Sequence, residues 1–358
     1  ALHRLSRVST NSSVFLKTKR LEFRNTVATS SNTQKAIEEL LKSFENVQRT
    51  ASDVRQLNRF INTVSNLVSG PSSSLDIKIA SSAVEEMSRA FTMFAPYRDV
   101  RKVSIFGSAR TTPDSPIYAL TAATARALAD HQFMVVTGAG PGIMEAGMVG
   151  AGKENSIGVS IRLPFETGAN SVIAGDDKYV SMRYFFTRKL MLVKESHAFL
   201  CMPGGFGTLD ETFELLTLAQ TAKSVPVPIV FLEVPGHPFW TPLMKAMEPL
   251  LLDHGLISPS DTSLYTITDN IEDAVSEITR FYSNYDSIRF VNDVLYIRMK
   301  RAVPSDRFSE IATRFASLAT DGEILQTTAT AEEVKDNDVP EMPRVSLKYA
   351  AKGFAHLR

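Results

Sequence analysis

The chain has 358 residues, 44% of them hydrophobic, and its 39 Lys and Arg residues balance its 39 Asp and Glu residues. That length can build one large core with appendages or two modest domains. The balanced charge argues against a broad basic surface, so we expect no nucleic-acid partner. Cys201 is the single cysteine, which excludes a disulfide within these residues, and no apolar run of about 18 residues predicts a membrane span.

The first segment, residues 1–35, is rich in Lys, Arg, Ser and Thr and contains a single acid, Glu22. This composition is typical of a transit-peptide remnant and equally of a disordered basic tail, and both alternatives stay open. The low cysteine content suits a reducing compartment. We therefore expect a cytoplasmic protein, or a plastid protein if the tail is a transit-peptide remnant.

A helical extension is expected over residues 36–100. Apolar residues recur there at three- and four-residue steps and predict helices at 36–68 and 75–94. A run of Gly, Pro and Ser at 70–74 separates the two helices, and Pro96 ends the second one.

Short apolar runs alternate with helical patterns between residues 101 and 285. The predicted strands are 103–106, 133–136, 157–161, 198–202 and 228–232, and the predicted helices are 116–130, 141–152, 182–194, 207–221, 238–254 and 271–284. The strands are apolar throughout, which is typical of a parallel sheet that is buried on both faces. We therefore expect a Rossmann-like, doubly wound α/β domain over 101–285.

The last segment, residues 286–358, predicts a small α+β module. Its expected elements are strands at 294–301, 323–327 and 345–349, a helix at 306–318 and an acidic loop at 331–343.

Three glycine-rich loops follow predicted strands, at residues 107–110, 137–144 and 203–208. Ligands bind at the carboxyl ends of strands in such a sheet, and glycines let the backbone approach an anion closely. Thr208 can cap the next helix or donate its hydroxyl to the same anion. Glycines that only make tight turns for packing are the alternative, which three such loops at one edge make weaker.

The loop at 137–144 reads G-x-G-x-G after the second strand, which is a poor fit to the dinucleotide fingerprint G-x-G-x-x-G. The P-loop pattern G-x-x-x-x-G-K-[ST] does not occur in the chain. We expect no cofactor, and the sequence offers no cluster of metal ligands.

Charged residues flank the third loop. Glu211 and Glu214 are three residues apart in the next predicted helix, hence on one face, although acids also favour helix N-termini for their dipole. Arg188 and Lys189 lie one helix earlier, and a guanidinium suits bidentate contact with phosphate. A solvated surface pair is the alternative for these two basic residues.

The motifs together resemble a known family. The stretch P-G-G-F-G-T-L-D-E at 203–211 is similar to the P-G-G-x-G-T-x-x-E signature of the Lonely Guy family, the cytokinin riboside 5′-monophosphate phosphoribohydrolases. The stretch T-R-K-L-M-L at 187–192 resembles that family's Arg–Lys segment, and T-G-A-G-P-G-I-M-E-A-G at 137–147 and L-P-F-E-T-G-A-N at 163–170 resemble its longer cyanobacterial and algal-type members. Family members are often labelled lysine decarboxylases, but nothing in these residues supports pyridoxal phosphate chemistry.

The resemblance implies hydrolysis of the N-glycosidic bond of a purine riboside 5′-monophosphate, which releases free base and ribose 5-phosphate. It implies that Glu211 and Arg188 are the catalytic pair. The residues that it assigns to substrate binding are Gly204, Gly205, Gly207 and Thr208 for the phosphate, Ser108, Arg110, Lys189, Gly138 and Gly140 elsewhere on the nucleotide, Glu214 for ribose and Met144 for the base. It also suggests a homodimer or higher homo-oligomer.

Alternatives remain open at this point. Met144 is equally well explained as core filler. A general AMP or purine nucleotide nucleosidase would use the same residues, and a non-catalytic nucleotide or molybdenum-cofactor carrier or sensor would not need Glu211 and Arg188. The C-terminal module is compatible with effector binding, but none of its residues identifies a ligand.

Overall fold

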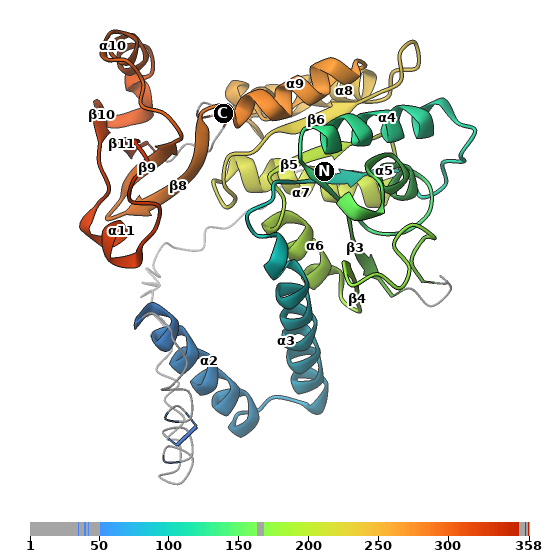
Figure 1. The fold of residues 1–358 in the computed structure, drawn as a ribbon, viewed down its shortest axis with the longest axis horizontal. Coiled ribbons are helices and arrows are strands. Elements are labelled where there is room, and N and C mark those ends of the chain that lie inside the picture. The colour runs from blue at the N-terminus through green and yellow to red at the C-terminus, as the bar shows by residue number, and fades with distance from the viewer. Residues whose placement is uncertain are drawn as a thin grey trace, which may run out of the picture. The chain divides into compact units, whose positions relative to one another are not determined.

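The computed structural model describes residues 35, 39, 40, 42, 51–162, 168–350, 355 and 357 (Figure 1). The chain divides into two compact units, Ala1–Lys78 and Ile79–Arg358. The predicted basic tail lies outside the described residues except for Lys35, as do most of 36–50 and the 163–167 part of the L-P-F-E-T-G-A-N stretch. No helix in the described part of the chain is long and apolar enough to cross a membrane.

The helical extension is confirmed where it is described, as α2 (Ala51–Ser69) and α3 (Ser74–Phe94). The start of α3 is fixed locally. The Ser73 amide and hydroxyl each lie 2.8 Å from the Asp76 carboxylate, and the Asp76 amide donates back to the Ser73 hydroxyl. This reciprocal arrangement is a capping box, which explains why the helix begins right after the Gly-Pro-Ser break.

The centre of the second unit is a parallel sheet, as predicted, and it has seven strands instead of the five that were expected. Its strand order is β4-β3-β2-β1-β5-β6-β7. The strands are β1 (Lys102–Phe106), β2 (Met134–Thr137), β3 (Ser156–Ile161), β4 (Tyr179–Met182), β5 (Ala198–Cys201), β6 (Ile229–Leu232) and β7 (Thr266–Thr268). The chain builds outward from β1 to β4 and then returns to add β5 beside β1, so the topological switch point lies between β1 and β5.

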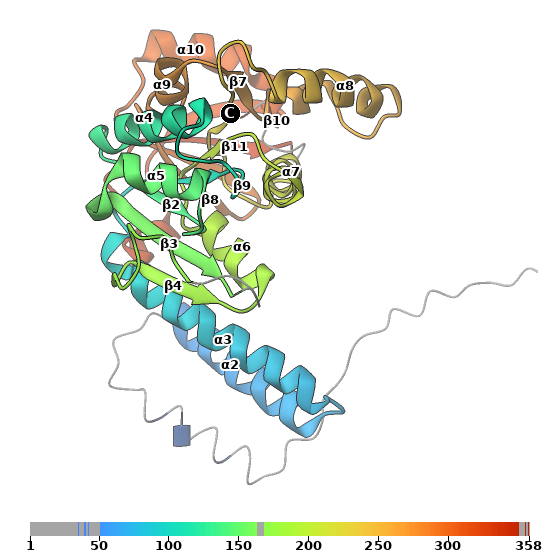
Figure 2. The ribbon, with the colours of Figure 1, turned by 90° about the vertical axis from the view of Figure 1, so that its right-hand side faces the viewer.

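Helices cover both faces of this sheet, and Figure 2 shows α4 and α5 on one side of the strands and α6 and α7 on the other. The helices are α4 (Pro116–Asp130), α5 (Ile143–Ala151), α6 (Phe185–Lys194), α7 (Phe206–Gln220), α8 (Trp240–Asp253) and α9 (Ile271–Phe281). Alternation along each strand explains the two layers, because Val103 and Ile105 enter one core cluster while Phe106 enters the other. Short 3-10 turns complete the unit at Ala95–Tyr97, Lys153–Asn155 and Pro259–Ser263.

The C-terminal part is a small antiparallel sheet with two helices, which confirms the predicted α+β module. The strand order is β10-β11-β9-β8. The elements are β8 (Tyr285–Val291), β9 (Val294–Met299), α10 (Ser305–Arg314), a 3-10 turn (Ala316–Leu318), β10 (Ala319–Thr327), α11 (Ala331–Asp336) and β11 (Arg344–Tyr349). Asn292 and Asp293 join β8 to β9, and their φ angles of 48° and 66° suit a two-residue hairpin turn of type I′.

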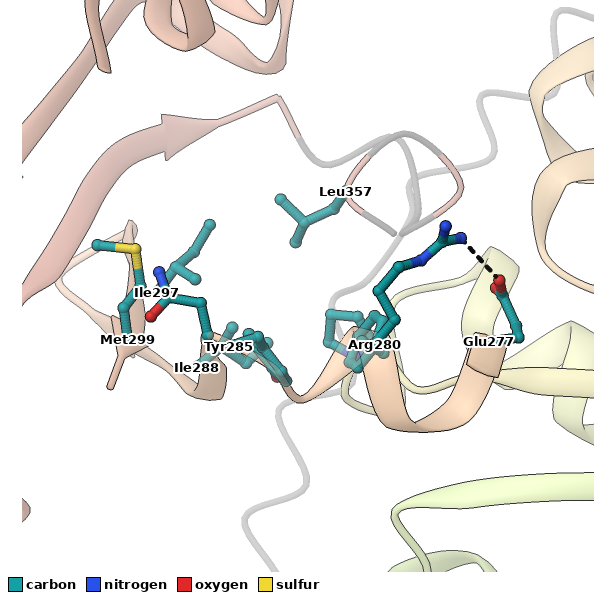
Figure 3. A pocket seen from close by; sticks show the side chains of 10 residues that line it. Glu277, Arg280, Tyr285, Ile288, Ile297, Met299 and Leu357 are labelled. Carbon is teal, nitrogen blue, oxygen red and sulfur yellow. Dashed lines mark hydrogen bonds and ion pairs between the residues drawn. The ribbon is translucent and has the colours of Figure 1, made fainter. Parts of the chain in front are cut away.

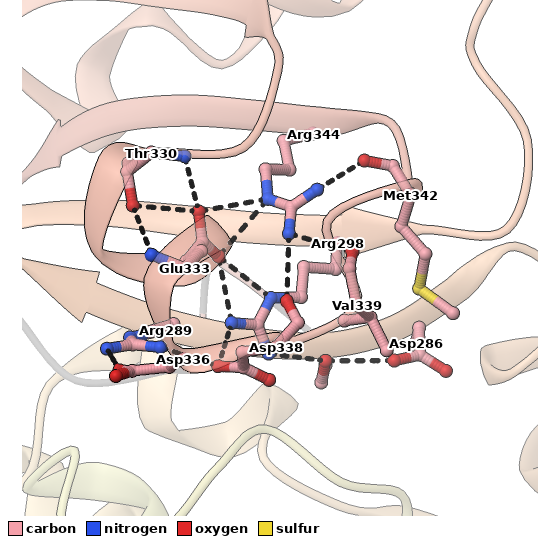
Figure 4. A network of polar contacts seen from close by, with 11 residues as sticks. Asp286, Arg289, Arg298, Thr330, Glu333, Asp336, Asp338, Val339, Met342 and Arg344 are labelled. Carbon is pink, nitrogen blue, oxygen red and sulfur yellow. Dashed lines mark hydrogen bonds and ion pairs between the residues drawn. The ribbon is translucent and has the colours of Figure 1, made fainter. Parts of the chain in front are cut away.

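Charged side chains connect the elements of this module, and we call them the Glu333 cluster: the buried Glu333, Arg298 and Arg344 and the partly exposed Asp338 and Arg289 (Figure 4). The fully buried Glu333 carboxylate lies 2.8 Å from Arg298 Nη2 and 3.1 Å from Arg344 Nε. Asp338 accepts hydrogen bonds from Arg298 and Arg289, at 2.5 and 2.7 Å. Burial alone raises the pKa of Glu333, but the Thr330 amide and the two guanidinium groups outweigh it and hold the pKa at about 2.

Several elements differ from the sequence predictions. The predicted loop at 331–343 is wrong in its first part, because α11 occupies it and begins with a capping box between Thr330 and Glu333. The strands β4, β7 and β8 were not expected. Each of them is only partly buried, so none carries the continuous apolar run by which the central strands were recognised.

Candidate functional site

The three glycine loops meet at the carboxyl edge of the sheet, beside the switch point. The Ser108 amide, after β1, donates to Pro203 O at 3.2 Å, after β5. The Ile143 amide donates to Ser108 O at 3.0 Å, which ties the second loop to the first. The loops that the sequence places at one edge therefore form a single surface at the position where ligands bind in doubly wound sheets.

The glycines of this surface are of two kinds. A Cβ on Gly204 would lie 2.2 Å from Thr208 Oγ1 and 3.0 Å from the Ser108 amide, so the fold itself requires glycine there. A Cβ on Gly205 or Gly207 would meet nothing within 4 Å. The packing of the chain therefore does not explain these last two glycines, whereas an anion that approaches the backbone closely does.

The loop leads into the N-terminus of α7. Gly205 is its N-cap residue and no side chain caps it. Thr208 is buried in the first turn, and its amide donates to Gly205 O at 3.0 Å. The first amides of a helix have no partner within the helix, so this end offers free N–H groups and a positive dipole end to an anion.

A lysine on α6 gathers the carboxylates of α7. Lys189 Nζ lies 2.8 Å from Asp210 Oδ2, 2.7 Å from Glu214 Oε2 and 3.8 Å from Glu211 Oε2. We call these four residues the Lys189 cluster. The predicted site residues Lys189, Glu211 and Glu214 are brought together, and Asp210 joins them, which the sequence did not assign to the site.

Glu211 is the most buried carboxylate of the cluster, with 7% of its surface exposed. Burial raises its pKa, while Lys189 and Arg188 act in the opposite direction and Glu214 and Asp210 add to the rise. For Lys189, burial lowers the pKa, but hydrogen bonds to Asp210 and Glu214 outweigh it and leave the pKa raised. The cation therefore stays charged and favours the ionised form of a carboxylate that burial disfavours.

Arg188 lies between the sheet and the second glycine loop. Its Nε donates to Val159 O at 3.1 Å. A Cβ on Gly138 would lie 2.3 Å from Arg188 Nη2 and 2.7 Å from Met144 Sδ, and a Cβ on Gly140 would lie 2.6 Å from Met144 Cε. Glycine at both positions therefore makes room for the guanidinium and for Met144, and it brings these predicted site residues into one neighbourhood.

Asn170 is a residue of this region that the sequence did not single out. Its amide donates to Ala139 O at 2.8 Å and its Nδ2 donates to Gly140 O at 3.0 Å. It thereby clamps the second loop at Ala139, whose φ of 57° is unusual for a residue other than glycine. The signal in the sequence was its place at the end of the L-P-F-E-T-G-A-N stretch.

The remaining predicted residues, Ser108 and Arg110, belong to the first loop. Ser108 Oγ accepts a hydrogen bond from the Arg110 amide at 3.1 Å, which shapes the first loop. The Arg110 side chain is exposed. Within the described residues, no group of three or more His, Cys, Asp or Glu side chains is arranged to hold a metal ion.

A cavity of about 390 Å³ lies elsewhere, between α9 and strands β8 and β9 (Figure 3). Its walls include Phe281, Tyr285, Ile297 and Met299, with Arg280 and its ion-pair partner Glu277 (3.3 Å) on one side. None of the predicted site residues lines it.

Comparison with known proteins bears on this arrangement. A protein-family model described as "Possible lysine decarboxylase" matches residues 142–278. A cytokinin riboside 5′-monophosphate phosphoribohydrolase of Arabidopsis thaliana is 29% identical over 101 residues, which is 28% of this chain and 45% of the relative. One from Mycobacterium tuberculosis is 32% identical over 99 residues, which is 28% of this chain and 51% of the relative. The chain thus spans about half the length of the curated relatives it matches.

Among solved structures, a molybdenum cofactor carrier protein from Chlamydomonas reinhardtii aligns with a TM-score of 0.34 at 18% identity, over 51% of this chain and 97% of that chain. A likeness at that level carries no argument about function. The matched segment contains Arg188, Lys189 and the stretch 203–211, on which the resemblance rests. Over the matched segment the chain is therefore similar to curated proteins named cytokinin riboside 5′-monophosphate phosphoribohydrolases.

Proposed function

We propose that this protein hydrolyses the N-glycosidic bond of purine riboside 5′-monophosphates, with a cytokinin riboside 5′-monophosphate as the preferred substrate. One observation carries the proposal. The buried Glu211 carboxylate lies within the first turns of a helix whose N-terminus opens onto Gly205 and Gly207. This pairing of an uncapped helix N-terminus with a carboxylate supports a site that takes the 5′-phosphate at the loop and the ribose at the carboxylate.

The 5′-phosphate is assigned to the loop at 203–208. The free amides at the start of α7 and the Thr208 hydroxyl donate to its oxygens, and the positive end of the helix dipole stabilises its charge. Arg188 is assigned to fix the nucleotide from the opposite helix, α6. Met144, which packs against Gly138 and Gly140, is assigned to the base.

Glu211 is assigned the chemical role. As the bond between the anomeric carbon and the base nitrogen breaks, the base takes the bonding electrons and the ribose carbon becomes positive. An ionised carboxylate stabilises that charge and draws a proton from the water that attacks the carbon, and the departing base is protonated from solvent. Burial disfavours this ionised form and raises the pKa of Glu211, and Lys189 offsets part of that penalty. We therefore propose that Lys189 acts mainly by stabilising the ionised form of Glu211, more than by contacting the substrate directly.

Product chromatography tests the proposal. Wild type and Glu211→Gln are incubated with AMP and, separately, with isopentenyladenosine 5′-monophosphate, and the unphosphorylated nucleosides serve as controls. We expect release of base from the monophosphates only, and loss of that release in Glu211→Gln. Faster release from AMP would favour a general purine nucleotide nucleosidase. Folded wild type that binds the nucleotides but releases no base would favour a carrier or sensor.

A further inference from the structure

A carboxylate of the helical extension is buried next to the helix that carries the basic pair. Glu86, on α3, has only 3% of its surface exposed. Its Oε1 accepts a hydrogen bond from the Arg183 amide at 2.7 Å, and its Oε2 accepts from the Tyr184 amide at 3.4 Å and from Thr187 Oγ1 at 2.9 Å. All three donors belong to the entry into α6.

Glu86 stands where the pattern of α3 calls for an apolar residue. Ala83, Ala90 and Phe94 are buried at three- and four-residue steps around it, and Ala90 and Phe94 belong to the core of the sheet domain. A carboxylate on such a stripe is costly unless it is fully hydrogen-bonded. Helix packing alone would favour a nonpolar side chain, so the three donors of α6 account for Glu86.

The helix that receives Glu86 has no cap of its own. Its N-cap residue is Tyr184, no side chain of α6 caps it, and its first turn carries no acidic residue. A tyrosine side chain cannot accept a hydrogen bond from the first amides of its own helix, as Ser, Thr, Asp or Asn does at this position. In a capping box the third helical residue returns a carboxylate to the N-cap amide, but here that residue is Thr187. Glu86 supplies the missing carboxylate from another helix and places negative charge at the positive end of the dipole.

The capped turn leads directly into the site. The Arg188 amide makes the first helical hydrogen bond, to Tyr184 O at 3.2 Å, and Thr187 is fully buried. Arg188 and Lys189 follow at once, and they must reach Val159 O and the carboxylates of α7. The position of the first turn of α6 therefore determines the backbone positions from which the side chains of Arg188 and Lys189 extend.

We propose that Glu86 is a positioning residue of the site: by capping α6 from α3, it holds Arg188 and Lys189 in the geometry that the reaction needs. The inference rests on the proposed function, and it gives the helical extension a part in catalysis.

The test compares Glu86→Ala and Glu86→Gln with Glu85→Ala, whose parent residue is the exposed neighbour on the same helix. Turnover of the best monophosphate is measured together with hydrogen exchange of the peptide over 183–190. We expect Glu86→Ala to lower kcat about 10- to 100-fold with a much smaller change in KM, because a small displacement of catalytic groups has that effect. Exchange in 183–190 rises, Glu86→Gln recovers only part of kcat because its amide has a single accepting oxygen and no charge, and Glu85→Ala matches wild type.

Two results would overturn the inference. Unchanged exchange over 183–190 in Glu86→Ala would mean that the carboxylate does not cap α6. Faster exchange with wild-type kcat would mean that the cap is structural only. If Glu86→Ala does not fold, the same two criteria apply to Glu86→Gln, whose amide keeps the shape but loses the charge and one accepting oxygen. Wild type that releases no base would instead refute the proposed function, so the two failures are distinguishable.

Discussion

At the scale of single residues, neighbouring glycines in the loop after β5 have different causes. Gly204 is required by Thr208, which leaves no room for a Cβ, whereas Gly205 and Gly207 face open space. A motif that reads as one unit in the sequence therefore combines a folding requirement with a ligand requirement. The two can be separated by substitution.

We predict that Gly207→Ala changes the free energy of unfolding by less than about 1 kcal/mol. The same variant raises the KM for the monophosphate about 10- to 100-fold, because it obstructs a charge-assisted hydrogen bond from the backbone. Gly204→Ala is the matched control and loses about 1–3 kcal/mol of stability through overpacking. Denaturant unfolding and steady-state kinetics measure both effects. A wild-type KM in Gly207→Ala would place the phosphate elsewhere.

A second residue-scale prediction concerns the pH profile. Burial raises the pKa of Glu211, and Lys189 opposes that rise. Lys189→Met removes the cation, so the pKa of Glu211 rises further. As the pH falls, Glu211 is then protonated at a higher pH than in wild type. We expect the acid limb of kcat/KM to move to higher pH in Lys189→Met. Lys194→Met, half-exposed on the same helix, should keep the wild-type limb. If the acid limb of kcat/KM lies at the same pH in Lys189→Met as in wild type, the ionisation of Glu211 does not set that limb.

At the scale of elements, the Glu333 cluster shows how ion pairs can connect the helices and strands of a module that has a small apolar core. Among its described residues, the small antiparallel sheet buries few apolar side chains: Leu295, Met299, Ala319, Ile324 and Leu347. Glu333 and Arg344, both fully buried, connect α11 to β11, and Arg298 adds β9 to the same network. Losing one partner would leave an unpaired buried charge, which is among the costliest changes a fold can suffer.

We predict that Arg344→Met destabilises the protein by about 3–5 kcal/mol, measured by chemical unfolding. Lys348→Met is the control on the same strand, since its ion pair with Asp321 is at the surface, and it should stay close to wild type. Comparable losses in both variants would contradict the cluster's role.

The same cluster predicts acid sensitivity. The pKa of Glu333 is held at about 2, below its ordinary value of 4.5. A depressed pKa contributes stability that is complete above the ordinary value and is lost as the pH falls toward about 2, and the full contribution is about 3 kcal/mol. This titration spans roughly pH 5 to 2. Over that range the free energy of unfolding should therefore fall less steeply in Glu333→Gln than in wild type. Parallel slopes would assign the acid loss to other carboxylates.

At the scale of the whole molecule, large apolar side chains lie exposed on the two helices that build the site. Phe185, Phe186 and Leu190 on α6 have 47–54% of their surface exposed, and Phe206 at the start of α7 has 93%. Exposed apolar side chains that gather near one another mark an interaction surface. They support the expectation of a homo-oligomer from the sequence.

We predict that wild type is at least a dimer in light scattering after size exclusion and that Phe186→Glu shifts it toward the monomer. Leu325→Glu is the control, because Leu325 is equally exposed, at 55%, but belongs to β10 of the C-terminal module. A monomeric wild type would refute the prediction, and dissociation in both variants would leave α6 without a special role.

Features that depend on local chemistry could be predicted from the amino-acid sequence alone. Apolar runs predicted the central strands, and the helical pattern between two of them predicted α4 at 116–130 as the structure has it. The positions of the glycines after the strands predicted the three loops at one edge. The partly buried strands β4, β7 and β8 were not predicted, because they lack a continuous apolar run. The helix α11 had a readable signal in its Thr330–Glu333 capping box, which the acidic composition of the segment concealed.

Which charged groups come into contact depends on the three-dimensional fold and could not be predicted from the sequence. Glu86 and Arg183 are 97 residues apart in the chain, and Lys189 and Glu214 are 25 apart, so no local pattern pairs them. Their meeting follows from the order of the strands, since the return from β4 to β5 sets α6 beside α7 and leaves room for α3 on the same face. Motifs fix which chemistry is available, whereas sheet topology fixes which groups share a low-dielectric neighbourhood and hence which of them is ionised.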